Sequence, residues 1–185
     1  MPIYEQIRAD RQLLELIGDI AIKPDIQLKK IKNAIKSYVP EGRVEPEDVL
    51  LLIDNTIFRS GKEGMILTEE ELFAFSGVAG KCSLRLEELV SVSPQTRLAL
   101  KVLKHLNIKE DSVGLVLNDR HFISLPGIRD RVQVGGEEVA AIAYLALFLH
   151  EALGCALVLG EEPDSGPAPW HDRGAPNWQP DDDED

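Results

Sequence analysis

The sequence predicts an α+β fold in which helices precede a small antiparallel β-barrel and one further helix follows it. Three observations support this prediction. Apolar residues repeat with helical spacing up to residue 40, short alternating runs follow between residues 49 and 125, and a long apolar segment covers residues 139–159. About seven short strands at close spacing, with no helix-length segment between them, favour an antiparallel barrel or sandwich over a parallel α/β sheet.

Composition divides the 185 residues into three parts. We expect an N-terminal helical extension over residues 1–40, the β-rich domain with its C-terminal helix over residues 47–160, and a disordered acidic tail over residues 161–185. The tail holds nine acidic residues and one basic residue, Arg173, so it carries −8 of the net charge of −12 and leaves −4 for the rest. Neither part has the broad positive surface of a nucleic-acid-binding protein, so nucleic acid is disfavoured as a partner.

The N-terminal part predicts two amphipathic helices, one ending near Gly18 and the next starting near Pro24. Their apolar stripes are Ile3, Ile7, Leu14 and Ile17, and then Leu28, Ile31, Ile35 and Tyr38. Lys29, Lys32 and Lys36 follow the flank of the second stripe. A solvated helix edge is the favoured interpretation of these lysines, and a surface for an acidic partner is the alternative.

The segment from Leu50 to Phe75 reads LLLIDNTIFRSGKEGMILTEEELFAF. Its first residues are apolar on both faces and predict a buried strand, which ends where polar side chains can bond to the nearby backbone. We expect Asp54 and Thr56 to accept hydrogen bonds from backbone amides of the following loop. Two glycines in that loop permit a positive φ, and the two apolar runs after it predict a β-hairpin.

The run Asp54-Asn55-Thr56-Ile57-Phe58-Arg59-Ser60-Gly61-Lys62-Glu63-Gly64, followed by Leu67-Thr68, resembles the D-x-T-x-F-G-S-x-K-x-G…T signature of bacterial PH-like domains of unknown function. The resemblance implies a pleckstrin-homology-like barrel preceded by helices, and it implies no catalytic residues. The structural motif that it defines is Asp54, Thr56, Phe58, Gly61, Gly64 and Thr68. Arg59 departs from the signature, because a glycine usually follows the phenylalanine.

Further strands are predicted at Lys81–Leu86, at Leu89–Val92 and at 98–102, and Ser93-Pro94 is expected to end the second of them. Val113–Leu117 and His121–Leu125 predict a hairpin around Asn118-Asp119. The last helix is expected over Val139–Leu159. One of its apolar stripes should close the barrel, and the other, with Tyr144, Leu147 and Phe148, should meet the N-terminal helices or a second subunit. A homodimer through this helix is therefore one expectation.

A transmembrane segment is disfavoured because Glu151 lies within the last helix, and an acidic residue at the bilayer centre costs about 3 kcal/mol on insertion scales. The sequence predicts no cofactor, metal site or catalytic constellation. A phosphate-binding loop at Gly61-Lys62 is disfavoured, because it would need a glycine where the chain has Thr56 and a serine or threonine where it has Glu63. The two cysteines, without a signal peptide, are typical of a reducing compartment, so a cytoplasmic location is expected.

We therefore predict a non-catalytic PH-like binding module for a protein or peptide. The alternative is peripheral binding to a membrane or anionic lipid through a basic loop surface of Arg59, Lys62, Lys81 and Arg85. The candidate binding residues are Arg59, Ser60, Lys62, Lys81 and Arg85, with Trp170 and Trp178 of the tail as aromatic anchors. One interpretation is that the tryptophans dock on a partner or on the domain itself, and the alternative is that they are simply solvated.

Overall fold

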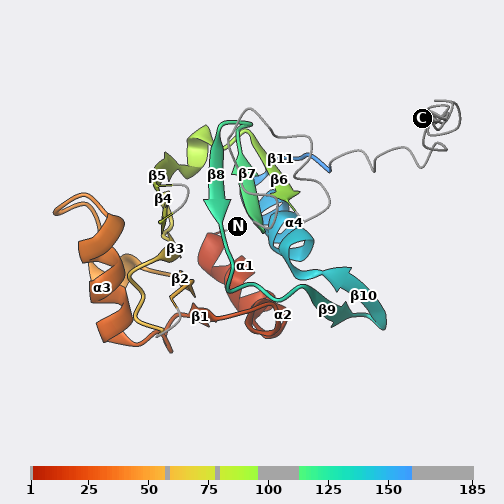
Figure 1. The fold of residues 1–185 in the computed structure, drawn as a ribbon, viewed down its shortest axis with the longest axis horizontal. Coiled ribbons are helices and arrows are strands. Elements are labelled where there is room, and N and C mark those ends of the chain that lie inside the picture. The colour runs from red at the N-terminus through yellow and green to blue at the C-terminus, as the bar shows by residue number, and fades with distance from the viewer. Residues whose placement is uncertain (1, 57–58, 78–79, 96–112, 160–185) are drawn as a thin grey trace, which may run out of the picture.

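The strands of this protein form three sheets in the part of the chain that the computed structural model describes, residues 2–56, 59–77, 80–95 and 113–159 (Figure 1). The first sheet is antiparallel and consists, in this order, of β1 (Ile20–Ile22), β2 (Leu51–Asp54), β3 (Gly64–Leu67), β4 (Glu71–Ser76) and β5 (Gly80–Arg85). The second has the order β11-β6-β7-β8 and consists of β6 (Ser91–Gln95), β7 (Gly114–Leu117), β8 (His121–Ser124) and β11 (Ala156–Leu157). The third is the hairpin of β9 (Arg131–Val134) and β10 (Glu137–Ala140).

The mixed α+β class is observed, whereas a closed barrel is not found in these ranges. A barrel would need β5 and β6, which follow one another in the chain, to pair, but they belong to different sheets. The 3₁₀-helix η2 (Leu86–Glu88) separates them and ends the pairing with β4, and β6 then pairs with β7 and β11. The sheets still touch where β4 lies near β8. The strand order of the second sheet depends on contacts between segments that are distant in the sequence, and local periodicity does not encode such contacts.

The central strands β2 and β3 of the first sheet are buried on both faces, as the two-sided apolar run predicts. Helix α3 (Leu28–Tyr38) covers one face, where Ile31, Ala34 and Tyr38 pack against Leu52, Ile66 and Phe73. The other face contributes Leu51, Ile53, Met65 and Leu67 to the main core. That core also contains residues of α1 (Ile3–Ala9), α2 (Arg11–Leu16) and α4 (Ala141–Leu153). Alternate side chains of β2 and β3 therefore belong to two cores.

The N-terminal segment forms two short helices instead of the single helix that the sequence predicts. Asp10 separates α1 from α2 with backbone angles of φ −94° and ψ 7°. Aspartate is a poor residue for a helix interior because its side chain competes for backbone hydrogen bonds. The predicted stripe of Ile3, Ile7, Leu14 and Ile17 is nevertheless buried. The short strand β1, which follows, pairs with β2 and was not predicted.

The second sheet departs from the prediction at one strand and agrees at one hairpin. β6 does not stop at Ser93-Pro94, because Pro94 pairs with Leu115 inside the strand. On its other side β6 pairs with β11 only at Ser91 and Val92, so no described neighbour needs the missing N–H of proline. The β7–β8 hairpin turns at Asn118 and Asp119, whose φ angles are 52° and 55°, as in a type I′ turn.

Helix α4 is shorter than predicted, because residues 137–140 form strand β10 and Gly154 ends the helix with a φ of 68°. Leu145 and Leu149 are fully buried, Phe148 is nearly so, and Leu147 is 37% exposed. No helix within the described ranges is long and apolar enough to cross a membrane. Phe58, the predicted strand at 98–102 and the acidic tail with Trp170 and Trp178 lie outside the described residues.

Candidate binding surface

The segment from Asp54 to Gly64, here called the 54–64 loop, is held by the carboxylate of Asp54, which is 1% exposed. Its Oδ1 accepts hydrogen bonds from the backbone N–H (3.0 Å) and hydroxyl (2.6 Å) of Thr56, and its Oδ2 accepts one from the Gly61 N–H at 3.1 Å. Thr56 Oγ1 accepts a bond from the Ser60 N–H at 2.6 Å. Asp54 and Thr56 thus bond to loop amides in the way that the sequence predicts.

The same loop lies against α3. The Asn33 side-chain amide donates to the Ser60 carbonyl oxygen, and the Ser37 hydroxyl donates to that of Lys62, each at 2.7 Å. Gly61 has a φ of 73°, and a Cβ atom there would lie 2.7 Å from the carbonyl oxygen of Lys30. The close approach of loop and helix therefore requires glycine at this position.

The charge of Asp54 is balanced by Lys30, whose Nζ lies 3.0 Å from Oδ2. Burial alone would raise the pKa of Asp54. The hydrogen bonds from Thr56 and Lys30, together with the positive charge of Lys30, outweigh that effect and hold the pKa below its ordinary value. Asp54 therefore remains a carboxylate, and its bonds to the loop are charge-assisted.

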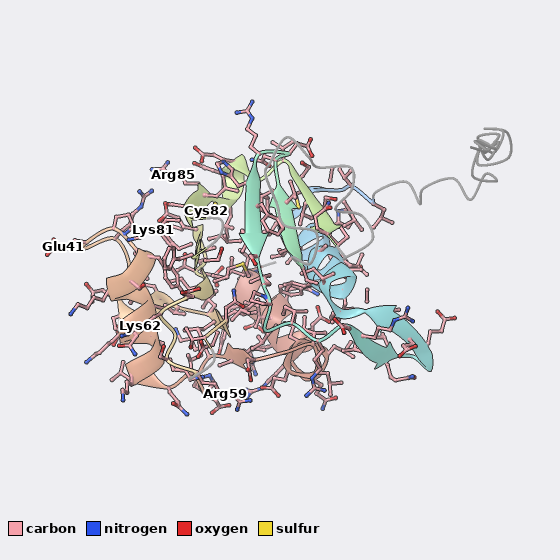
Figure 2. All side chains as sticks on the ribbon, in the orientation of Figure 1. Glu41, Arg59, Lys62, Lys81, Cys82 and Arg85 are labelled. Carbon is pink, nitrogen blue, oxygen red and sulfur yellow. The ribbon has the colours of Figure 1, made fainter. Side chains whose placement is uncertain are left out.

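Arg59 has a φ of 50°, in the left-handed region that favours glycine. This is the position at which the signature that residues 54–68 resemble usually has a glycine. The Arg59 guanidinium forms an ion pair with Asp19, at 3.2 Å from its Oδ1. Arg59 therefore points toward the segment before β1, well away from Lys81 and Arg85 (Figure 2).

Strand β5 brings together two of the predicted binding residues. Lys81 and Arg85 pair across the sheet with Phe75 and Glu71, so their side chains lie on the face of the sheet that α3 covers farther along. Among the described residues β5 is an edge strand and pairs only with β4. Lys81, Ser83 and Arg85 are all exposed. This end of the α3 face is thus accessible and positively charged.

The outer edge of β5 presents main-chain groups for pairing. The N–H of Leu86 donates to the Glu70 carbonyl oxygen at 2.8 Å, so the chain at Leu86 bonds toward β4. Successive residues of a strand direct their N–H and C=O groups to opposite sides. The main-chain groups of Lys81, Ser83 and Arg85 therefore point away from β4.

The side chains next to this edge have partners in the first sheet and in the segment after α3. Glu71 accepts hydrogen bonds from Arg43, one of them at 2.9 Å, and lies 3.9 Å from the Arg85 guanidinium. The Lys81 ammonium lies 6.0 Å from the centre of the Phe75 ring. Because Arg85 remains 57% exposed in spite of its acidic neighbours, it can still reach a ligand.

The remaining sequence-predicted residues do not join one surface. Ser60 serves the 54–64 loop through its contacts with Thr56 and Asn33, whereas the Lys62 side chain is exposed beside the end of α3. The open edge of β5 was missed, although the alternation of polar and apolar residues at 81–86 predicts a strand with one exposed face. Between Lys81 and Arg85, Cys82 is half-buried on the opposite face, and burial raises the pKa of its thiol.

A second feature is a surface pocket of about 360 Å³ at the β3–β4 turn. It is lined by Tyr4, Lys23, Arg43, Val44, Glu47, Asp48, Leu50 and Thr68–Glu71. Several of its charged groups already have partners in the fold. Glu69 accepts hydrogen bonds from the Ile3 and Tyr4 N–H groups at the start of α1, and Glu71 binds Arg43. The edge of β5 therefore remains the better candidate for a binding surface.

No group of three or more histidine, cysteine or acidic side chains that could hold a metal ion occurs within the described ranges. Comparison with known proteins adds no assignment: no protein-family model, no curated protein and no solved structure matches the chain.

Proposed function

We propose that this protein is a non-catalytic binding module that receives an extended, acidic segment of a partner protein along the outer edge of β5. The observation that carries the proposal is the combination of a six-residue edge that no described strand covers and two exposed cations on it. A partner segment that pairs with an edge strand gains main-chain hydrogen bonds, and its alternate side chains supply specificity.

The cations select the chemistry of the partner. Alternate side chains of an added strand would lie beside Lys81 and Arg85, which favours aspartate or glutamate at every second position. Charged side chains on an edge also discourage pairing with unselected strands. The resemblance of residues 54–68 to PH-like domains supports the same class of function by analogy.

The test uses a displayed library of random peptides and two variants of one residue. Ser83→Pro removes a main-chain donor that points outward, and proline is tolerated at such an edge position. Ser83→Ala removes only the hydroxyl and is the matched control. Peptides selected on the wild-type protein should be rich in alternating acidic residues, should bind Ser83→Ala equally, and should bind Ser83→Pro at least about tenfold more weakly, a difference of 1.4 kcal/mol. Equal affinity of both variants, with unchanged melting temperatures, would exclude pairing at β5.

A second candidate is the peripheral binding of anionic lipid, which the exposed side chains of Lys62 and Lys81 support. Arg59 and Arg85 contribute less to it, because Asp19, Glu71 and Glu87 lie within ion-pair distance of them. Sedimentation with phosphatidylserine vesicles tests this candidate. Binding that Lys62→Gln and Lys81→Gln weaken, while Ser83→Pro leaves it unchanged, would favour lipid over a peptide.

A further inference from the structure

Helix α3 carries a positively charged stripe that the β5 site does not use. Residues 28–38 include four lysines and no acidic residue. Lys30 binds Asp54, but Lys29, Lys32 and Lys36 are exposed and form no ion pair with a described residue. Their spacing of three and four residues places them on one side of the helix, over about 10 Å of its length.

Two neighbours extend this stripe. Lys62 is exposed, and the Ser37 hydroxyl holds its carbonyl oxygen beside the C-terminal turn of α3. At the other end Leu28 is 53% exposed next to Lys29. We call Leu28, Lys29, Lys32, Lys36 and Lys62 the lysine face. It combines one apolar contact with four positive charges in a protein of net charge −12.

We propose that residues 181–185 of the same chain bind to the lysine face, with Trp178 covering Leu28. These five residues are all acidic, and in an extended conformation they span about 13 Å, which matches the lysine stripe. Trp178 precedes Asp181 by three residues, about 10 Å of extended chain, so it reaches Leu28 when Asp181 lies near Lys29.

The chain is long enough for this contact. Between Leu159, the last described residue, and Asp181 an extended chain spans up to about 70 Å, more than a domain of this size requires. Binding within one chain is favoured because the linker keeps the acidic segment at a high effective concentration. The charges steer the segment, and the tryptophan supplies an apolar anchor.

The experiment follows the fluorescence of Trp178 alone. Trp170→Phe leaves it as the single tryptophan, since the chain has two. In low salt its emission should be blue-shifted, and it should move to the wavelength of an exposed tryptophan as NaCl rises to about 0.5 M, where screening is strong. Replacing Lys29, Lys32 and Lys36 by glutamine should abolish this shift. The control variant replaces Arg8, Arg120 and Arg129 by glutamine. These arginines are also exposed, so it removes the same amount of charge elsewhere and should leave the shift intact.

Three results would overturn the inference. Emission of an exposed tryptophan at every salt concentration would show that no docking occurs. An equal shift in the lysine triple variant would place Trp178 elsewhere. A shift that depends on protein concentration would assign the lysine face to a second copy of the chain. Ser83→Pro should not change the shift, because β5 is outside the lysine face, so this test and that of the β5 site succeed or fail separately.

Discussion

Lys30 Nζ on α3 lies 3.0 Å from Oδ2 of Asp54 at the end of β2, and the two side chains are only 18% and 1% exposed. Asp54 also holds the 54–64 loop through the N–H groups of Thr56 and Gly61. The helix, the first sheet and the loop are therefore joined at one carboxylate. A change at that carboxylate should affect all three.

Asp54→Asn preserves the size of the side chain but removes its charge. We expect it to lower the free energy of unfolding by about 3 kcal/mol, because it leaves the Lys30 ammonium without its partner in a largely buried position. Urea denaturation measures the change. Asp25→Asn is the control: it breaks an ion pair with Arg11 in which Asp25 is 67% exposed, and such surface pairs contribute less than about 1 kcal/mol. Similar losses in both variants would contradict the role of Asp54.

The pKa of Asp54 predicts a pH dependence. Because the folded-state pKa lies below the ordinary value of 3.8, the carboxylate stabilises the fold above that pH. This contribution disappears as the pH falls through the folded-state pKa. Asp54→Asn has no such group, so its stability should fall less than that of the wild type between neutral pH and strongly acidic pH. Parallel stability curves for the two proteins would show that another group is responsible.

Gly64 is required by the approach of β2 to β3. Its φ is 135°, and a Cβ atom there would lie 1.9 Å from the carbonyl oxygen of Ile53. Gly64→Ala should therefore prevent folding or lower the melting temperature severely. Gly42 also has a positive φ, 71°, but no heavy atom lies within 4 Å of a Cβ atom there. Gly42→Ala should cost only about 1–2 kcal/mol, from its backbone conformation alone. Equal melting temperatures for the two variants would contradict the steric argument.

Local features of the fold could be predicted because neighbouring residues determine them. The two-sided apolar run predicts β2, Asn118-Asp119 predicts the tight turn, and the alternation at 81–86 predicts β5. The division into separate sheets could not be predicted. It depends on pairs such as Ile20 with Ile53 and Ala156 with Ser91, which are distant in the sequence.

The same distinction applies to the candidate site. Lys81 and Arg85 share a face because they are four residues apart on one strand, which the spacing predicts. Arg59 was grouped with them on charge alone, and its ion pair with Asp19 places it elsewhere. The open edge of β5 also escaped prediction, because whether a strand has a second neighbour is a property of the whole sheet.

Tyr38 has a buried hydroxyl for which no described residue provides a hydrogen bond. Burial raises its pKa, and the negative charge of Asp54 adds to the effect. Tyr38→Phe keeps the ring that packs 6.4 Å from Phe75 and removes the unpaired oxygen. The free energy of unfolding should therefore be unchanged or rise by up to about 1 kcal/mol, and the melting temperature should follow it. Tyr38→Ala, which also removes the ring, should cost about 3–5 kcal/mol. A substantial loss in Tyr38→Phe would mean that the hydroxyl has a partner.

Two substitutions in helix α4 test whether its second apolar stripe contacts another subunit. Leu149 is fully buried in the main core, so Leu149→Ala should lower the free energy of unfolding by about 2–5 kcal/mol. Leu147 is 37% exposed, and Leu147→Ala should change stability by no more than about 0.5 kcal/mol in a monomer. Urea denaturation at two protein concentrations, with the mass in solution from light scattering, separates the cases. If the wild-type protein is a dimer, and Leu147→Ala loses much more stability at the protein concentration at which the wild type dimerises, this stripe is an interface. An equally large loss in a protein that is monomeric throughout would mean that Leu147 packs within its own chain.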